Sequence, residues 1–110
     1  MKNAGVKKFE NREQQYEETF TMGQIKITKP TEAELEQMGV KNWPIWTKEV
    51  SKFDWHYDQQ ETCYILEGKV KVTAGDETVS FGPGDLVVFP EGLDCTWEVI
   101  EPVKKHYKFG

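Results

Sequence analysis

The side chains with the clearest chemical potential in this sequence are an imidazole, a carboxylate and two thiols. His56 and Glu61 are five positions apart in the sequence, Cys63 is two positions after Glu61, and Cys95 comes later in the chain. If Glu61 begins a strand that faces a barrel interior, its carboxylate requires a metal, a cation or hydrogen-bond donors. The alternative is a surface glutamate before a turn. The Cys95 thiol becomes a ligand or nucleophile only where a histidine or metal lowers its pKa, so a pair with His56 is conceivable.

Two further residues bear on a binding site. Trp97 is the tryptophan best suited to line a ligand site by stacking. Cys63 is expected to be a small buried residue, and the same alternative applies to Cys95. Two cysteines without a CxxC pair are too few for a disulfide framework, so both are expected to be free thiols.

Composition limits the class of protein. A chain of 110 residues fits one domain with a single core. Its 14 basic and 19 acidic residues are interspersed and give a net charge of -5, which argues against nucleic-acid or anionic-membrane partners. No apolar run is long enough to span a bilayer and none resembles a signal peptide, so we expect a cytoplasmic protein.

The chain divides into an extension and a domain. Residues 1–21 are polar without clear periodicity and are expected to be a partly ordered extension, with the domain over residues 22–110. Within the domain, Thr31 with Glu34 forms a capping-box signature and Gly39 is a stop signal, which together predict one short helix.

Short strands account for most of the rest. We predict them at residues 45–50, 52–57, 62–67, 69–74, 77–81, 86–90, 95–100 and 103–109, after a first alternating strand near residues 24–28. The connections are glycine-rich or contain proline, and Glu67-Gly68 is predicted to close a tight hairpin. Many short strands with such turns predict an all-β sandwich or barrel.

Alternation along two of these strands predicts an inner wall. Side chains alternate between the two faces of a strand, so Cys63 and Ile65 point inward if Glu61 does. By the same period of two, Trp97 and Val99 point inward if Cys95 does. A carboxylate, two thiols and an indole would then share a pocket.

Two sequence motifs resemble those of the cupin family. The first is His56, four residues, Glu61, six residues and Gly68; the second is Gly84, five residues, Pro90, one residue, Gly92, two residues and Cys95. The chain therefore resembles a small single-domain, RmlC-like cupin, similar to the cupin domain of ureidoglycine aminohydrolase and to the EutQ-like group. The resemblance implies a jelly-roll barrel, or double-stranded β-helix, with one short N-terminal helix.

The resemblance also implies a metal site, in altered form. Cupins use three histidines and a glutamate, and the corresponding positions here are Asp54, His56, Glu61 and Cys95. His56, Glu61 and Cys95 are chemically adequate for a divalent metal such as zinc, with Asp54 or water as a fourth ligand, and manganese, iron or nickel are the other metals considered. No metal is certain from these residues, and a redox oxygenase is disfavoured.

The strand at residues 52–57 gives conflicting indications. Simple alternation places Asp54 and His56 on the face opposite Phe53, Trp55 and Tyr57, toward solvent. The family correspondence directs Asp54 and His56 inward. Both orientations remain open at this point.

The functional hypothesis is a small-molecule-binding barrel with a degenerate metal site. Its pocket is expected near the candidate residues named above: Asp54, His56, Glu61, Cys63, Cys95 and Trp97. The alternative is a metal-dependent hydrolase or aminohydrolase acting on a small, nitrogen-rich, ureidoglycine-like substrate. We expect a homodimer with no nucleic-acid or membrane partner, and the residues leave enzymatic activity open.

Overall fold

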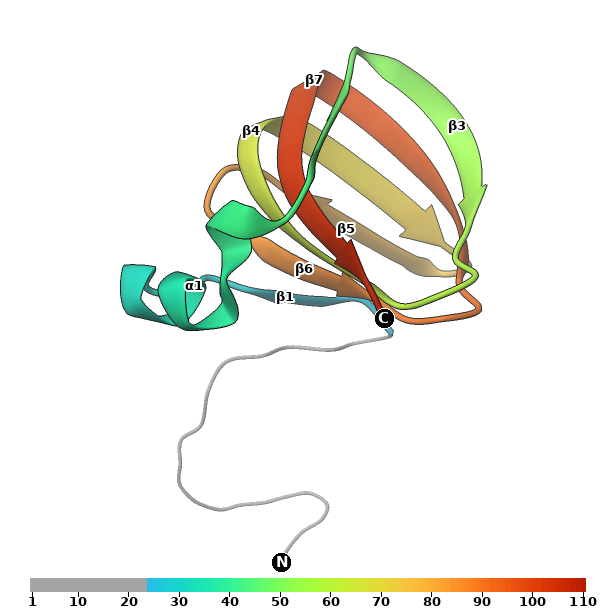
Figure 1. The fold of residues 1–110 in the computed structure, drawn as a ribbon. Coiled ribbons are helices and arrows are strands. Elements are labelled where there is room, and N and C mark those ends of the chain that lie inside the picture. Colours follow the sequence, from blue (N-terminus) through green and yellow to red (C-terminus); the bar gives the residue numbers. More distant parts are fainter. Residues whose placement is uncertain (1–23) are drawn as a thin grey trace, which may run out of the picture.

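The computed structural model describes residues 24–110, so the predicted extension and its boundary at Met22 lie outside the described residues. The elements are β1 (Lys26–Thr28), α1 (Glu32–Met38), a 3-10 turn η1 (Val40–Asn42), β2 (Ile45–Lys48), β3 (Ser51–His56), β4 (Glu61–Ala74), β5 (Glu77–Phe81), β6 (Leu86–Phe89) and β7 (Asp94–Phe109). Strands dominate and one short α-helix is present in this part of the chain, which confirms the predicted all-β class (Figure 1).

The helix begins and ends where the sequence predicts. The Thr31 side chain accepts a hydrogen bond from the backbone of Glu34, and the Glu34 side chain accepts one from the backbone of Thr31. At the other end Gly39 adopts a left-handed conformation with φ of 71°. These reciprocal caps satisfy backbone groups that a seven-residue helix would otherwise leave without partners.

Two long strands, β4 and β7, hold the fold together. They pair with each other, and each changes its other neighbour along its length: β4 pairs first with β6 and then with β5, and β7 pairs first with β3 and then with β2. All these pairings are antiparallel, and β1 extends the sheet beyond β6. The sheet therefore consists of two halves that share bent strands and enclose a common interior (Figure 1).

The bend lies where Gly68 of β4 meets Pro102 of β7. Gly68 has φ of 101°, and a Cβ on it would press against the Pro102 carbonyl oxygen and lie 2.7 Å from the Val103 Cα. The pairing of the two strands shifts register here, between Ile65 and Val70. The hairpin predicted at Glu67-Gly68 is therefore wrong: glycine permits a close approach between two continuous strands, which makes the local signal resemble that of a turn.

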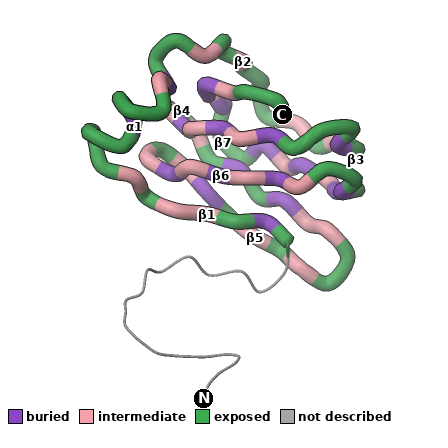
Figure 2. The backbone as a smooth tube through the Cα atoms, turned by 60° about the horizontal axis from the view of Figure 1, so that its bottom comes forward, coloured by how far each residue is buried: buried purple, intermediate pink, exposed green. Residues whose placement is uncertain are grey.

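Burial follows the alternation predicted for the inner wall. Glu61, Cys63 and Ile65 are buried on β4, and Cys95, Trp97 and Val99 are buried on β7. Figure 2 shows this alternation along the strands, while α1 is mostly exposed. Within residues 24–110 the one α-helix is far too short to cross a bilayer.

Candidate functional site

A pocket of about 570 Å³ opens between β2, β3 and the second half of β7. Its walls are mainly aromatic, and its polar groups are few. The lining residues are Trp46, Lys48, Phe53, Asp54, Trp55, Tyr57, Glu61, Trp97, Lys105, Tyr107 and Phe109. Cavities of roughly 300–1,000 Å³ that combine apolar walls with a few placed polar groups are typical of small-molecule sites.

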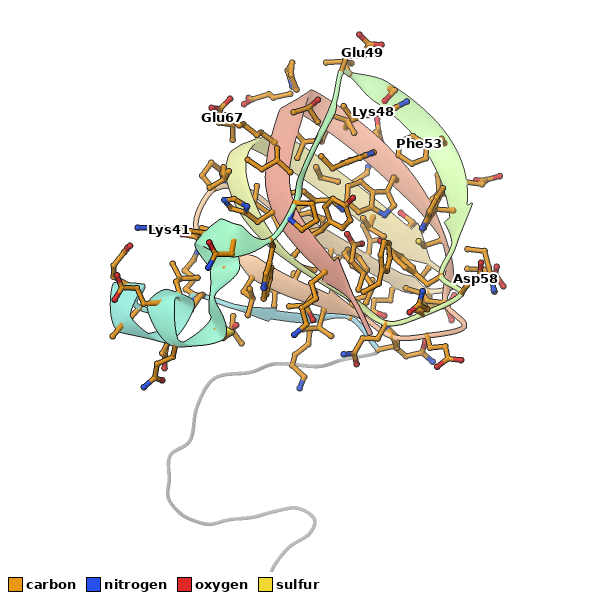
Figure 3. The ribbon with its side chains drawn as sticks, in the orientation of Figure 1. Lys41, Lys48, Glu49, Phe53, Asp58 and Glu67 are labelled. Atoms are coloured by element: carbon orange, nitrogen blue, oxygen red, sulfur yellow. The ribbon has the colours of Figure 1, made fainter. Side chains whose placement is uncertain are left out.

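The edge strands supply one wall of the pocket. Phe53 of β3 stacks against Trp97 of β7 with ring centroids 6.1 Å apart and an interplanar angle of 18°. Figure 3 shows Phe53 on the concave side of β3 with Lys48 beside it, and the Lys48 ammonium lies 5.3 Å from the Phe53 ring centroid. Trp55, on the same face of β3, is 48% exposed at the mouth. Trp55 therefore offers an exposed ring surface to a flat ligand.

Glu61 carries the central negative charge of the pocket. It is the first residue of β4, and its side chain is 3% exposed. Its two oxygens have different partners: the Tyr57 hydroxyl donates to Oε1 at 2.6 Å, and the Lys105 ammonium donates to Oε2 at 2.6 Å. The buried carboxylate is therefore paired and hydrogen-bonded by side chains, as an anion away from water must be.

Tyr57 is held as a proton donor. Burial raises the pKa of its hydroxyl well above the ordinary value, and the neighbouring Glu61 charge raises it further. The ring stacks on Phe89 with centroids 4.9 Å apart. Tyr57 therefore keeps its proton and fixes one side of the Glu61 carboxylate.

Lys105 carries the opposing charge. Its side chain is 6% exposed, and its ammonium lies 4.7 Å from the Trp46 ring centroid and 4.5 Å from that of Trp97. The faces of indole rings attract cations, particularly where water is excluded. One carboxylate and two ring faces therefore fix the ammonium within the wall of the pocket.

Trp97 presents an unused donor. Its side chain is buried, and its Nε1 has no hydrogen-bond partner among residues 24–110. A buried indole N–H usually finds an acceptor. The Nε1 atom is itself buried, so it stays without a partner inside the wall of the pocket.

The two thiols are buried but do not line the pocket. Burial raises the pKa of Cys63 to about 12, and burial followed by the Asp94 charge raises that of Cys95 to about 11. The Cys95 thiol donates to the Trp55 carbonyl oxygen at 3.6 Å. Both side chains are therefore unreactive core groups, and Cys95 has no His56 partner that would activate it.

His56 points away from the pocket. Its side chain is 53% exposed, and its Nδ1 contacts the Asp94 carboxylate at 2.6 Å. Asp54 borders the pocket, yet its exposed carboxylate accepts a hydrogen bond from Thr96 at 2.8 Å. Simple alternation therefore gives the correct orientation for β3, and the inward orientation taken from the cupin correspondence is wrong. Large aromatic residues on the other face gain more from burial than these polar groups would.

The residues do not fit the metal site that the resemblance implies. The structure does not bring His56, Glu61 and Cys95 together, and no group of three potential ligands forms within residues 24–110. The decisive observation is chemical: the ammonium of Lys105 occupies the side of Glu61 where a cation would bind. Two cations at one carboxylate in a buried site would repel each other.

The pocket depends on residues that sequence reasoning did not select. Lys105, Tyr57 and Trp46 are the principal ones. A signal for Lys105 was present in the sequence, because a period of two along β7 places Lys105 on the same face as Val103 and Tyr107. A lysine in an inward register of a strand indicates a buried counter-charge, and Glu61 is that charge.

Comparison with known proteins identifies the family of this chain. The model of the EutQ-like cupin domain matches residues 35–107. The chain belongs to this cupin family. A DUF861 family protein from Thermotoga maritima, known from its crystal structure, is 57% identical with a TM-score of 0.78, and the match covers 79% of this chain and 100% of that one.

More distant cupins share the fold. EutQ from Clostridium difficile is 22% identical with a TM-score of 0.56, over 59% of this chain and 52% of that one. A putative ethanolamine utilization protein Q from Salmonella typhimurium is 22% identical with a TM-score of 0.57, over 77% and 68%. These identities show the fold alone. No curated protein matches the chain.

Proposed function

We propose that this cupin binds a small molecule with a flat apolar body and a hydrogen-bond acceptor. The observation that carries the proposal is the buried Lys105–Glu61 ion pair in an aromatic pocket of about 570 Å³. Burying two charges costs free energy that a hydrophobic pair of similar size would avoid. A buried ion pair in the wall of the pocket therefore supports a role in ligand recognition.

The walls and the polar groups support different parts of the ligand. Trp46, Phe53 and Trp55 line the pocket with at least partly exposed rings, which suits a planar body. The remaining N–H bonds of Lys105 suit an acceptor oxygen. Because Lys105 and Glu61 neutralise each other, the buried part of the site favours an uncharged polar group such as a carbonyl.

The test is a titration with acetophenone, which combines a flat ring and a carbonyl, and with cyclohexanol as a non-planar control. Three of the four tryptophans line the pocket, so intrinsic fluorescence reports occupancy. We expect quenching and a higher melting temperature with acetophenone and neither with cyclohexanol. Absence of both signals with acetophenone would contradict the proposal.

Two matched variants locate the site. Trp55→Ala removes an exposed ring at the mouth of the pocket, and we expect it to weaken acetophenone binding about tenfold. Trp43→Ala removes the same ring outside the pocket and should leave affinity unchanged. Equal effects of the two variants would argue against this pocket as the binding site.

The other functional expectations stay predictions. A ureidoglycine-like aminohydrolase activity would rely on a metal, and the donor set at Glu61 does not fit one. Homodimerisation and a cytoplasmic location are likewise predictions, which sedimentation analysis and cell fractionation would test.

A further inference from the structure

We propose that Lys105 is an amine nucleophile that forms an imine with small aldehydes or ketones entering the pocket. The proposal rests on the proposed function, because the carbonyl compound must first bind. Lys105 lines the pocket, and its amine nitrogen has a proton acceptor and two aromatic faces around it. Each of these serves a separate requirement of the reaction.

The first requirement is a route for the ammonium proton. Glu61 Oε2 lies 2.6 Å from Lys105 Nζ, within direct transfer distance. Transfer converts an ion pair into a neutral amine and a neutral carboxylic acid. In a buried site of low dielectric this neutral pair is far closer in energy to the ion pair than it would be in water. Desolvation of a buried lysine favours its neutral amine, which is the form that attacks carbonyl groups in imine chemistry.

The second requirement is a fixed position for the carboxyl group after it accepts the proton. Tyr57 donates to Glu61 Oε1 at 2.6 Å, so the oxygen that faces Lys105 remains the site of proton exchange. The hydroxyl of Tyr57 keeps its own proton because of burial and the adjacent charge, which raise its pKa. Glu61 therefore exchanges a proton with Lys105 without losing its orientation.

The reaction then balances with no cofactor. The neutral Nζ attacks the carbonyl carbon, a C–N bond forms as the C=O π bond breaks, and a proton moves from the attacking nitrogen to the former carbonyl oxygen to give a neutral carbinolamine. The carboxylic acid of Glu61 protonates the hydroxyl group, the C–O bond breaks, and water leaves. The product is an iminium at Nζ with Glu61 again a carboxylate, so the site begins and ends as an ion pair.

The third requirement is stabilisation of the charged product. The iminium cation has its nitrogen where the ammonium now lies, 4.7 and 4.5 Å from the Trp46 and Trp97 ring centroids. Both ring faces therefore attract the product as they attract the resting ammonium.

The test is reductive trapping with propanal and sodium cyanoborohydride at neutral pH, followed by peptide mass spectrometry. Reaction governed by access alone would modify exposed lysines first and buried Lys105 last. We expect the initial rate at Lys105 to exceed that at Lys71 by about tenfold or more. Lys48, at the mouth of the same pocket, and Lys71, on the outer surface, are internal controls in the same sample.

Two variants separate chemistry from access. Glu61→Gln removes the proton acceptor and should reduce trapping at Lys105 about tenfold or more while Lys71 is unchanged. Tyr57→Phe keeps the acceptor and should reduce trapping by a smaller factor. The ratio of trapping rates at Lys105 and Lys71 is measured in the wild-type protein. This ratio therefore tests the proposal even if a variant fails to fold.

The outcomes also distinguish this inference from the proposed function. If acetophenone quenches fluorescence but Lys105 is the slowest lysine to be trapped, the imine proposal is wrong and binding stands. If acetophenone does not bind and Lys105 is not selected, both fail. Selective trapping at Lys105 that depends on Glu61 supports both.

Discussion

Lys105 Nζ and Glu61 Oε2 lie 2.6 Å apart across the paired strands β7 and β4, and both side chains are almost completely buried. Such a pair does not by itself make a fold stable, because desolvation offsets much of the attraction. Its loss is nevertheless costly, since the remaining charge has no water to solvate it. The pair therefore affects both the stability of the barrel and the chemistry of its pocket.

The first prediction concerns Lys105→Met, which leaves Glu61 buried without its cation. We expect the free energy of unfolding to fall by about 3–5 kcal/mol, measured by urea denaturation. The control is Lys71→Met, because Lys71 pairs with Glu98 at 3.6 Å on the surface; the expected loss is about 0–1 kcal/mol.

A double variant completes this measurement. Adding Glu61→Gln to Lys105→Met removes the uncompensated charge and should restore part of the lost stability. Equal losses in Lys105→Met and Lys71→Met would show that the buried pair has no special energetic role.

The second prediction concerns the pH dependence of the outer-face pair. The hydrogen bond to Asp94 is the largest cause that raises the pKa of His56 above its ordinary 6.5, followed by the charges of Asp94 and Asp58. Figure 3 shows Asp58 on the outside of the barrel, and its side chain is 93% exposed. A raised folded-state pKa means that the stabilisation is fully present below about pH 6.5 and is lost as pH rises through the folded value.

Proton NMR of the imidazole ring measures this directly. We expect His56 to titrate above 6.5 in the wild type and lower in Asp94→Asn. The stability difference between the wild type and His56→Gln should be larger at pH 5.5 than at pH 8. A His56 titration that is unchanged by Asp94→Asn would remove that residue as the cause.

The third prediction is that both thiols resist alkylation in the folded protein. With pKa values of about 12 for Cys63 and about 11 for Cys95, the thiolate fraction at pH 8 is very small. The pKa shift of Cys95 alone should slow iodoacetamide about a hundredfold relative to the unfolded chain. Mass spectrometry of native and urea-unfolded samples provides the comparison. Rapid labelling of Cys95 in the native protein would contradict the prediction and support Cys95 as a nucleophile.

The fourth prediction tests the bend between β4 and β7. Gly68→Ala combines a strained φ of 101° with a Cβ pressed against the Pro102 backbone, and we expect it to cost about 3 kcal/mol or more. Gly92→Ala is the matched control, because its φ is 89° but a Cβ there meets open space; roughly 1–2 kcal/mol is expected. Thermal unfolding of both variants gives the order, and equal losses would mean that contact with Pro102 is unimportant.

Local sequence signals located most elements of this fold, although they divided β4 near Gly68 and β7 near Pro102, where the structure has continuous strands. The capping box of Thr31 and Glu34 determines where the helix starts, and the period of two places Cys63, Trp97 and their neighbours inside. These predictions succeed because they depend on residues close together in the chain. Gly68 misleads for the same reason, since a glycine required by a distant strand looks like a glycine required by a turn.

Only the tertiary structure decided which groups meet in the pocket. Glu61 was a sequence candidate, but its partner Lys105 lies 44 residues away and was not selected. His56 matched a family motif, yet the gain from burying Phe53 on the opposite face turns it to solvent. The sequence by itself determined a small all-β cupin and named Glu61 as a candidate for an inward-facing carboxylate. Whether that carboxylate faced a metal or an ammonium depended on strand pairing across the barrel, because charge compensation is a property of groups brought together in space rather than of their spacing in the chain.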